Sequence, residues 1–552
     1  MWKIFWGGVI LLYYSIISLG KMAYLDYFFI FERRDKMRKI GKVLCALGFV
    51  ALLFGCDKKN NENTKSKTNA ITAKNTTTRQ SDLDKELEMY EWKKENNDIV
   101  ITRIKETTNT NIVIPSCVTK IGNSAFSGNG VKNIYLGDNV TSIGENAFRN
   151  CSNLENIIIS AKLKEVDRFA FAYDSSSSRS SNQNIYYNGT LENWCNIKFN
   201  GYAANPMTYS ANFYIHDSAG AINYNGDKYQ LLETIAVPSS ITKIGDYQFS
   251  GLKNIDTIIL PNSITNIGIK SFHWCNKGST IKNIEFGKEV TLIKSRAFED
   301  TTIENVYYNG SFDDWAMINF DDIDDDGEVS GMSPSPVGYR TNNFYIYDIA
   351  GMERFDGKTY RIPTSINLSN SITSINQYQF KNFKNIRNVS LPSSVKSISK
   401  SAFSNCLELR SVSNVENIES IGPNAFSYCT NLSNCIISNK TVSIGYGAFR
   451  NCEKIEQIIL GNNIETIGSG AFESCSGIET IIIKSKCFTI YEGAFYLTNV
   501  VSIYFEGSNT EWNITVEDNC LGSATLYFYS ETEPSTAGNY WHYVEGVPTM
   551  WS

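Results

Sequence analysis

A six-residue motif, I-G-x-x-A-F, recurs with substitutions along the chain and constrains its fold more than any other feature. From Ile375 to Ile490 every step between neighbouring copies is 23 residues. A period of this length is typical of solenoids, in which each repeat is too small to bury its apolar face alone. The twelve copies begin at positions 121, 143, 166, 244, 267, 293, 375, 398, 421, 444, 467 and 490.

A second recurring element, L-x-x-I-x-L, precedes many of the hexads, for example at Val131–Leu136 and Ile455–Leu460. Side chains of a strand alternate between its faces, so the constant apolar residues should point into a core and the residues between them outward. The hexad's Gly and small Ala suit a tight turn in which the Phe fills the interior. Strands of successive coils are expected to stack into a parallel sheet, roughly 4.8 Å apart.

The combined pattern, L-x-x-I-x-L-P-x-x-I-x-x-I-G-x-x-A-F-x-x-C, resembles the BspA-like class of bacterial leucine-rich repeats over residues 112–530. This resemblance implies a right-handed repeat solenoid of about twelve 23-residue coils. Such a solenoid has a parallel β-sheet on one face and short strands and helical turns on the other. BspA-like proteins are associated with adhesion to host matrix proteins and to other cells, so the resemblance implies an adhesin-like binding protein without catalytic activity.

The array is interrupted after the hexads ending at Phe171 and Phe298. An aromatic segment begins each gap and returns near the C-terminus, with Trp194, Trp315 and Trp512 at matching positions. The chain should therefore consist of three cassettes. They are predicted at 112–211, 212–343 and 344–525, between an N-terminal cap at 83–111 and a C-terminal cap at 526–552.

The first 56 residues should form an export signal. Its apolar region ends in Leu53-Phe54-Gly55-Cys56, which resembles a bacterial lipobox and implies a diacylated Cys56 after cleavage. Two acyl chains anchor a protein stably in a membrane. Met37 is a plausible start of translation, which would leave residues 1–36 untranslated; the alternative is an N-terminal membrane helix.

Residues 57–82 are so poor in apolar side chains that we expect a disordered tether. Together with the lipobox this predicts a protein anchored in the cell envelope, on its outer surface. The net charge of −6 gives no basic surface for phosphates, which argues against nucleic acid as a partner.

Six cysteines each lie three residues after a hexad Phe. Because they occupy one rung of the repeat, they are predicted to be small buried fillers rather than disulfide partners or metal ligands. They are Cys151, Cys275, Cys406, Cys429, Cys452 and Cys475.

Little in the sequence suggests catalysis. The three histidines, His216, His273 and His542, lie in different sections, and no metal, nucleotide or nucleophile motif is present. We therefore expect neither enzymatic activity nor a cofactor. Asp322, Asp324 and Asp326 precede a Gly as in a calcium loop, but Ser333 stands where a bidentate Glu belongs, so a solvated acidic insert is the favoured interpretation.

The outward position between the last two core residues of each strand is unusually apolar. It lies beside a row of uncharged polar residues that includes Asn133 and Asn156. We interpret the pair of rows as an extended face for binding an extracellular protein or cell-surface macromolecule; the alternative is that these residues stabilise the sheet by cross-strand packing and Asn ladders. The apolar members are Tyr135, Ile158, Tyr186, Ile259, Tyr307, Ile436, Ile459, Ile482 and Tyr504.

A second hypothesis is a lipoprotein that binds carbohydrate or handles polysaccharide. Trp194, Trp315 and Trp512 would then stack on sugar rings. The favoured interpretation of these residues is structural, as side chains wedged between stacks of coils.

Overall fold

The computed structural model describes residues 80–551, apart from 175–182, 210, 277, 325, 435, 485–486, 518–520 and 522–523. All described residues belong to one compact unit. The export signal, Cys56 and most of the tether lie outside the described residues. Within the described part no helix has the length and apolarity needed to cross a membrane.

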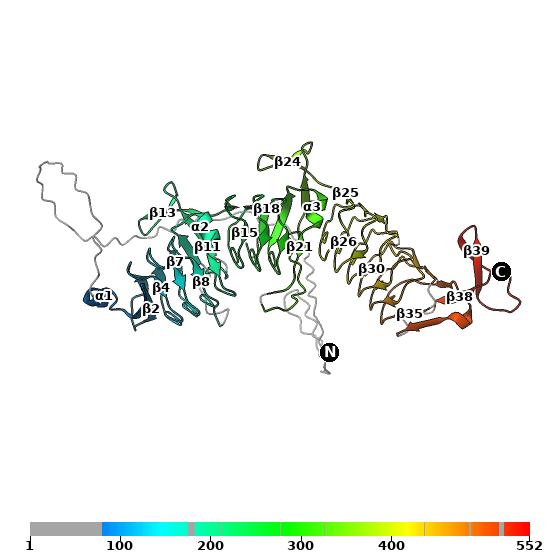
Figure 1. Cartoon of the computed structure of the whole chain (residues 1–552), viewed down its shortest axis with the longest axis horizontal. Helices are drawn as coiled ribbons and strands as arrows, with labels where there is room; N and C mark the ends of the chain where they lie inside the picture. The colour runs from blue at the N-terminus through cyan, green and yellow to red at the C-terminus, as the bar shows by residue number, and fades with distance from the viewer. Residues whose placement is uncertain are drawn as a thin grey trace, which may run out of the picture. The chain divides into compact units, whose positions relative to one another are not determined.

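Each regular coil contributes two strands, a long strand from the L-x-x-I-x-L element and a two-residue short strand that enters the hexad (Figure 1). Each strand pairs in parallel with its counterpart in the next coil, so that Ile398 lies opposite Ile421 and Val389 opposite Val412. The predicted solenoid with parallel strands is confirmed. Long strands and short strands pair only with their own kind, and together they form seven sheets among the described residues.

Three modules follow one another along the chain. The first begins with α1 (Gln80–Glu86) and the antiparallel hairpin β1 (Tyr90–Glu95) and β2 (Asp98–Ile104), which extends the short-strand sheet of β4, β6, β8 and β10. Its elements are β3 (Asn111–Val113), β4 (Lys120–Ile121), β5 (Asn133–Tyr135), β6 (Ser142–Ile143), β7 (Asn156–Ile159), β8 (Glu165–Val166), β9 (Gln183–Tyr187), α2 (Leu191–Cys195), β10 (Lys198–Phe199), β11 (Ala211–His216), β12 (Ile222–Tyr224) and β13 (Asp227–Leu231).

The second module repeats this plan and ends, like the first, in a hairpin. Its elements are β14 (Thr234–Ala236), β15 (Lys243–Ile244), β16 (Thr257–Ile259), β17 (Asn266–Ile267), β18 (Thr280–Phe286), β19 (Leu292–Ile293), β20 (Thr302–Tyr308), α3 (Phe312–Ala316), β21 (Asn319–Phe320), β22 (Asn343–Tyr347), β23 (Glu353–Phe355) and β24 (Lys358–Arg361).

The third module is the longest and ends in the hairpin of β39 and β40. Its elements are β25 (Ser365–Asn367), β26 (Ser374–Ile375), β27 (Asn388–Ser390), β28 (Ser397–Ile398), β29 (Ser411–Ser413), β30 (Ser420–Ile421), β31 (Ser443–Ile444), β32 (Gln457–Leu460), β33 (Thr466–Ile467), β34 (Thr480–Ile483), β35 (Cys487–Ile490), β36 (Ser502–Phe505), η2 (Asn509–Glu511), β37 (Asn513–Val516), β38 (Thr525–Tyr529), β39 (Tyr540–Val544) and β40 (Val547–Met550).

The sheets divide the chain at different places from the cassettes read in the sequence. The N-F-Y-I strands β11 and β22 continue the sheets of the preceding modules, because β11 pairs with β9 and β22 with β20. The hairpins after them belong to the same sheets. The first module therefore ends at Leu231 rather than at 211, and the second at Arg361 rather than at 343.

The hexad phenylalanines form the centre of the core. In the third module the rings of Phe380, Phe403, Phe426, Phe449, Phe472 and Phe495 stack in one series, with neighbouring centroids 5.1 to 5.4 Å apart. Shorter series run through the first and second modules. Each ring packs against the same ring of the next coil, which explains why Phe recurs at this position.

The hexad turn is made differently from the sequence expectation. Its fourth residue, not the Gly at its second position, has a positive φ, as Ser124 at 56° and Asn424 at 54° illustrate. A Cβ on Gly122 would meet the backbone oxygen of Ile101 at 2.7 Å. At Gly122 the close approach of the preceding strand leaves no room for a side chain, whereas the left-handed residue makes the turn.

The cysteine rung is buried and reduced, as predicted. All eight cysteines whose side chains the structure describes are free. The Cys429 Sγ donates to the Phe403 oxygen at 3.1 Å, and Cys452 Sγ donates to the Phe426 oxygen at 3.2 Å. These thiols thus fill space and also satisfy a buried carbonyl of the preceding coil.

We predict that these thiols resist alkylation in the folded protein. Burial raises the pKa of Cys151 and Cys475 to about 12, and a raised pKa leaves almost no reactive thiolate at pH 8. Iodoacetamide at pH 8, followed by peptide mass spectrometry, should leave both residues unmodified in native protein and modify them in urea. Rapid labelling of Cys429 in native protein would contradict the buried rung.

Candidate binding surface

The apolar outward row is covered, in each module, by the hairpin that ends the module (β13, β24 and β39 in Figure 1). In the first module, Tyr229 of β13 lies fully buried over Ile158 and Tyr186. The Tyr186 ring is also stacked on Tyr214 and Tyr224, at centroid distances of 4.8 and 4.2 Å. The outer row is therefore a second, smaller core.

The other two hairpins repeat this cluster. Tyr360 covers Tyr307 in the second module, and Trp541 covers Ile482 and Tyr504 in the third. Each covering ring is also tied down by a hydrogen bond. Tyr229 Oη donates to Asn188 Oδ1 at 2.6 Å, Tyr360 Oη donates to Asn309 Oδ1 at 2.5 Å, and Trp541 Nε1 donates to the Phe505 oxygen at 3.0 Å.

Glu285 is the one charged residue in the outward row, and the second hairpin accounts for it. Its side chain is 2% exposed and forms an ion pair with Lys358 of β24, whose side chain is 36% exposed. Asn309 Nδ2 also donates to Glu285 Oε1. A charge on the outer row is thus neutralised by a charge on the hairpin that covers it.

The expectation of a continuous exposed apolar stripe is consequently wrong. Tyr135 and Ile259 are half-buried, and only Ile459 among the nine, at 36%, counts as exposed. The six buried members are Ile158, Tyr186, Tyr307, Ile436, Ile482 and Tyr504. Five of the six are buried because each module folds its own terminal hairpin back onto the aromatic end of the row, whereas Ile436 belongs to the main core.

The neighbouring polar row forms a hydrogen-bonded ladder, as the alternative interpretation expected. Asn133 donates to Asn111, Asn156 to Asn133 at 2.6 Å, and Asn184 to Asn156 at 2.9 Å. Asn212 and Asn343 continue such ladders into β11 and β22. Since each amide is used by the next, these residues stabilise the stack.

Ile436 departs from the repeat because the long-strand sheet breaks beside it. Here the side-chain amide of Asn434 replaces the backbone groups that would pair with Val412. Its Oδ1 accepts from the Val412 nitrogen at 3.2 Å, and its Nδ2 donates to the Val412 oxygen at 2.7 Å. Ile436 is then fully buried in the main core. The sheet of β25, β27 and β29 ends here, and a new sheet begins at β32.

The uncovered part of the outward row is longest in the third module. It comprises Asn367, Ser390 and Ser413 on the strands β25, β27 and β29 and, beyond the buried Ile436, Ile459 on β32. We call these four residues the open row. It is largely polar, whereas the covered rows are aromatic and aliphatic.

Trp194 and Trp315 are fully buried and leave no ring face for a sugar. Trp194 Nε1 donates to the Gln248 oxygen at 3.0 Å, and Gln248 Nε2 donates back to the Trp194 oxygen at 2.6 Å. Trp315 and Gln379 make the same reciprocal pair. These wedges join one module to the next; Trp512 is only half-buried and packs edge-on against Phe505 at 5.1 Å.

The sequence held a signal for this contact. The first hexad of the second and third modules ends in Tyr-Gln-Phe, with Gln248 and Gln379 where other hexads have a small residue. A Gln fits there because the preceding element is a module end that offers a Trp carbonyl to its amide. The phrase is visible in the sequence, but its partner lies 54 residues away and is found only in the fold.

The calcium candidates do not converge. The Asp322 carboxylate receives bonds from Lys400 Nζ and Tyr378 Oη, both at 3.0 Å, while Asp324 lies 3.8 Å from Arg296. Burial would raise the pKa of Asp322, but these donors hold it below its ordinary value. Within the described ranges no three acidic, His or Cys side chains are grouped as metal ligands would be.

The histidines are packed as structural residues. His273 Nε2 lies 3.5 Å from Glu299, and its ring stacks on Trp274. His216 meets Tyr229 edge-on, and His542 stacks on Trp551. Each therefore has a packing role of its own.

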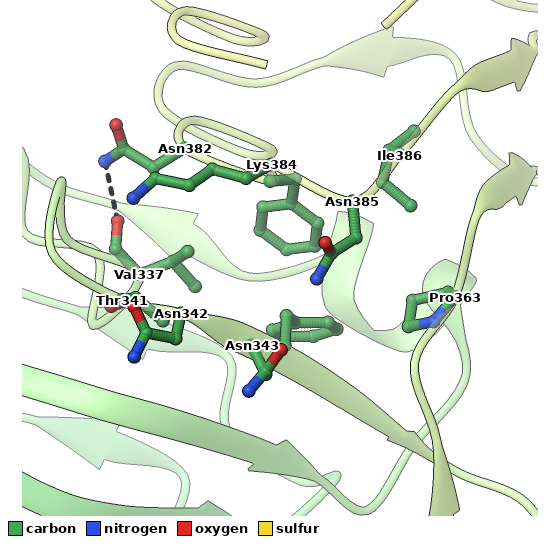
Figure 2. A pocket seen from close by; sticks show the side chains of 11 residues that line it. Val337, Thr341, Asn342, Asn343, Pro363, Asn382, Lys384, Asn385 and Ile386 are labelled. Carbon is green, nitrogen blue, oxygen red and sulfur yellow. Dashed lines mark hydrogen bonds between the residues drawn. The ribbon is translucent and has the colours of Figure 1, made fainter. Parts of the chain in front are cut away.

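Figure 2 shows a small cavity where the second and third modules meet. Asn382 Nδ2 donates across it to the Val337 oxygen at 2.7 Å. Its volume of about 10 Å³ is roughly that of one water molecule, so it is a packing gap and not a ligand site.

A family model described as the BspA type leucine rich repeat region matches residues 104–205, 211–323, 358–455 and 419–533, which is more than half of the chain. A search of curated proteins found no match to this chain.

Similar solved structures include a leucine rich cell surface protein from Faecalibacterium prausnitzii, 21% identical over 79% of this chain and 97% of that chain, with a TM-score of 0.41. A leucine-rich repeat protein from Bacteroides ovatus is 21% identical over 80% and 97%, with a TM-score of 0.46. The pneumococcal vaccine antigen PcpA is 15% identical over 78% and 96%, with a TM-score of 0.33.

We predict that Lys358→Met destabilises the protein by about 2 kcal/mol, because it leaves the buried Glu285 without its ion-pair partner. The loss is moderate because the Lys358 side chain is partly exposed. The double variant Glu285→Ile, Lys358→Met restores an apolar row and should recover most of the loss. Urea unfolding followed by circular dichroism measures both. A double variant no more stable than the single one would show that the pair does not hold the hairpin.

Proposed function

The chain belongs to the BspA-type leucine-rich repeat family, and from this premise we propose that it is an adhesin-like protein of the cell envelope that binds extracellular macromolecules without catalysing a reaction. The observation that carries the proposal is the open row of the third module. Every other long stretch of the outer sheet face is closed by the protein's own hairpins, whereas this one is left accessible.

The chemistry of the open row suits a protein partner. Ser390 and Ser413 present hydroxyls, Asn367 an amide, and Ile459 a single exposed aliphatic side chain. The neighbouring exposed residues Asn388 and Gln457 add amides on the same strands. An apolar anchor among groups that donate and accept hydrogen bonds is the usual composition of a protein interface.

A saccharide partner remains the second candidate, at a different place from the one that the sequence suggested. A groove of about 570 Å³ at the end of the second module is lined by Trp274, Asp300, Tyr339 and Arg340. Tyr339 is 70% exposed, and Trp274 Nε1 donates to Asp300 Oδ2 at 2.6 Å. An exposed aromatic ring beside charged side chains is a reasonable platform for a sugar.

We predict that Ile459→Lys weakens binding at least tenfold, because a charge replaces the apolar anchor of the open row. The full-length protein would be tested on immobilised extracellular matrix proteins and polysaccharides. Ile349→Lys is the matched control, since Ile349 is 85% exposed in the connection between β22 and β23 and is not part of the open row. An equal loss of binding in Ile459→Lys and Ile349→Lys would refute the open row as the binding surface. If Ile459→Lys retained binding to polysaccharides alone, the saccharide groove would be favoured.

The lipid anchor gives a separate prediction. If Cys56 is acylated, a protease added to intact cells should remove the solenoid from the natural protein. Cys56→Ala should release the protein into the medium or leave it unprocessed. Protection in intact cells, with cleavage only after permeabilisation, would place the solenoid in an internal compartment and exclude an adhesin.

A further inference from the structure

A groove separates the short-strand sheets of the first and second modules. β10 is the last strand of one sheet and β15 the first strand of the other, and the two sheets are not joined. The groove between them has a volume of about 710 Å³ and is lined by residues of both edges, including Phe199 and Lys243. This volume falls within the range of ligand sites in proteins.

The two edges present backbone groups to the groove. The nitrogens of Lys198 and Asn200 donate to β8, at Lys164 and Val166. Because alternate residues of a parallel strand face opposite neighbours, the N–H and C=O of Phe199 point away from β8. On the other side Gly268 donates to the Ile244 oxygen, so the backbone groups of Lys243 point away from β17.

The second junction shows how such an edge can be closed. There Gln377 Nε2 donates to the oxygen of Phe320 at 2.7 Å. The Asp322 carboxylate accepts hydrogen bonds from Gln377 Nε2 and Tyr378 Oη. Phe320 is the counterpart of Phe199, since both end a short strand that follows a buried Trp.

The first junction lacks both closing groups. Asp246 stands at the position of Gln377 and accepts from the Ile269 nitrogen at 2.8 Å, and a carboxylate has no proton to give a carbonyl. Gly201, which has no side chain, stands at the position of Asp322. The edge of β10 is therefore left open by two substitutions.

The charges along the groove favour an acidic occupant. Its lining carries four basic side chains, Arg168, Lys198, Lys243 and Lys294, against two carboxylates, Asp246 and Asp326. Lys198 lies 3.3 Å from Glu165, whereas no described carboxylate forms an ion pair with Arg168 or Lys243. Lys294 lies 3.9 Å from Asp246 and neutralises it in part. An acidic side chain on an added strand could pair with Arg168 or Lys243.

We propose that this groove binds an extended acidic peptide of a protein partner, which adds as a strand between β10 and β15. Backbone hydrogen bonds to Phe199 and Lys243 give affinity, and Arg168 and Lys243 select for acidic side chains. The proposal rests on the chain being a binding protein, but it concerns a surface separate from the open row.

The test uses the full-length protein and a fluorescein-labelled octapeptide of alternating Asp and Val. Fluorescence anisotropy should show saturable binding, weakened at least tenfold by Asp246→Gln, which copies the closure of the second junction. Lys243→Pro removes an N–H of the strand edge and should weaken peptide binding similarly. Circular dichroism checks that this variant is folded. If it is unfolded, Asp246→Gln alone decides the test. The same peptide with alternate backbone nitrogens methylated should also bind at least tenfold more weakly.

Absence of saturable binding overturns the proposal. So does equal affinity for Asp246→Gln, or equal binding of the methylated peptide, since charge attraction alone would then explain the result. Ile459→Lys is the control for the other surface and should leave peptide binding unchanged. The two proposals therefore fail independently.

Discussion

The stacking of one hexad phenylalanine on the next is the contact on which the rest of the structure depends. Rings such as Phe403 and Phe426 lie 5.2 Å apart, close to the spacing of strands in a sheet. The ring stack, the strand ladders and the amide ladder thus share one repeat distance. Any residue that enlarged this distance in one layer would strain the others.

The same constraint explains the ends of the modules. A coil that has no successor exposes its apolar side, and an open strand edge invites unwanted pairing. Each module covers its outer face with a terminal hairpin, and the first two modules also pack a Trp against the module that follows. At two junctions the Trp donates a hydrogen bond to the backbone oxygen of a Gln in the first hexad of the next module. At the third, Trp512 stays half-buried because no further module is present among the described residues.

Much of this fold could be predicted from the sequence, because the repeat is local and periodic. The period predicts the coils, and the cysteine rung follows from its fixed distance to Phe. The covered rows could not be predicted in this way. Tyr186 and Tyr504 look like outward surface residues when each strand is read alone, and the hairpin side chains that bury them, Tyr229 and Trp541, come from later in the chain. The closure of an edge by Gln377, or its absence at Asp246, likewise depends on a pairing between modules.

The reciprocal Trp–Gln contact also bears on how such a chain can change its length. Each junction is made of one residue at the end of a module and one at the start of the next, and the two known junctions use the same pair. A whole module can therefore be removed or duplicated between two such points with every remaining contact of the junction kept. The first two modules carry three hexads each and the third carries six, yet all three end in a covering hairpin, so this architecture accommodates modules of different length.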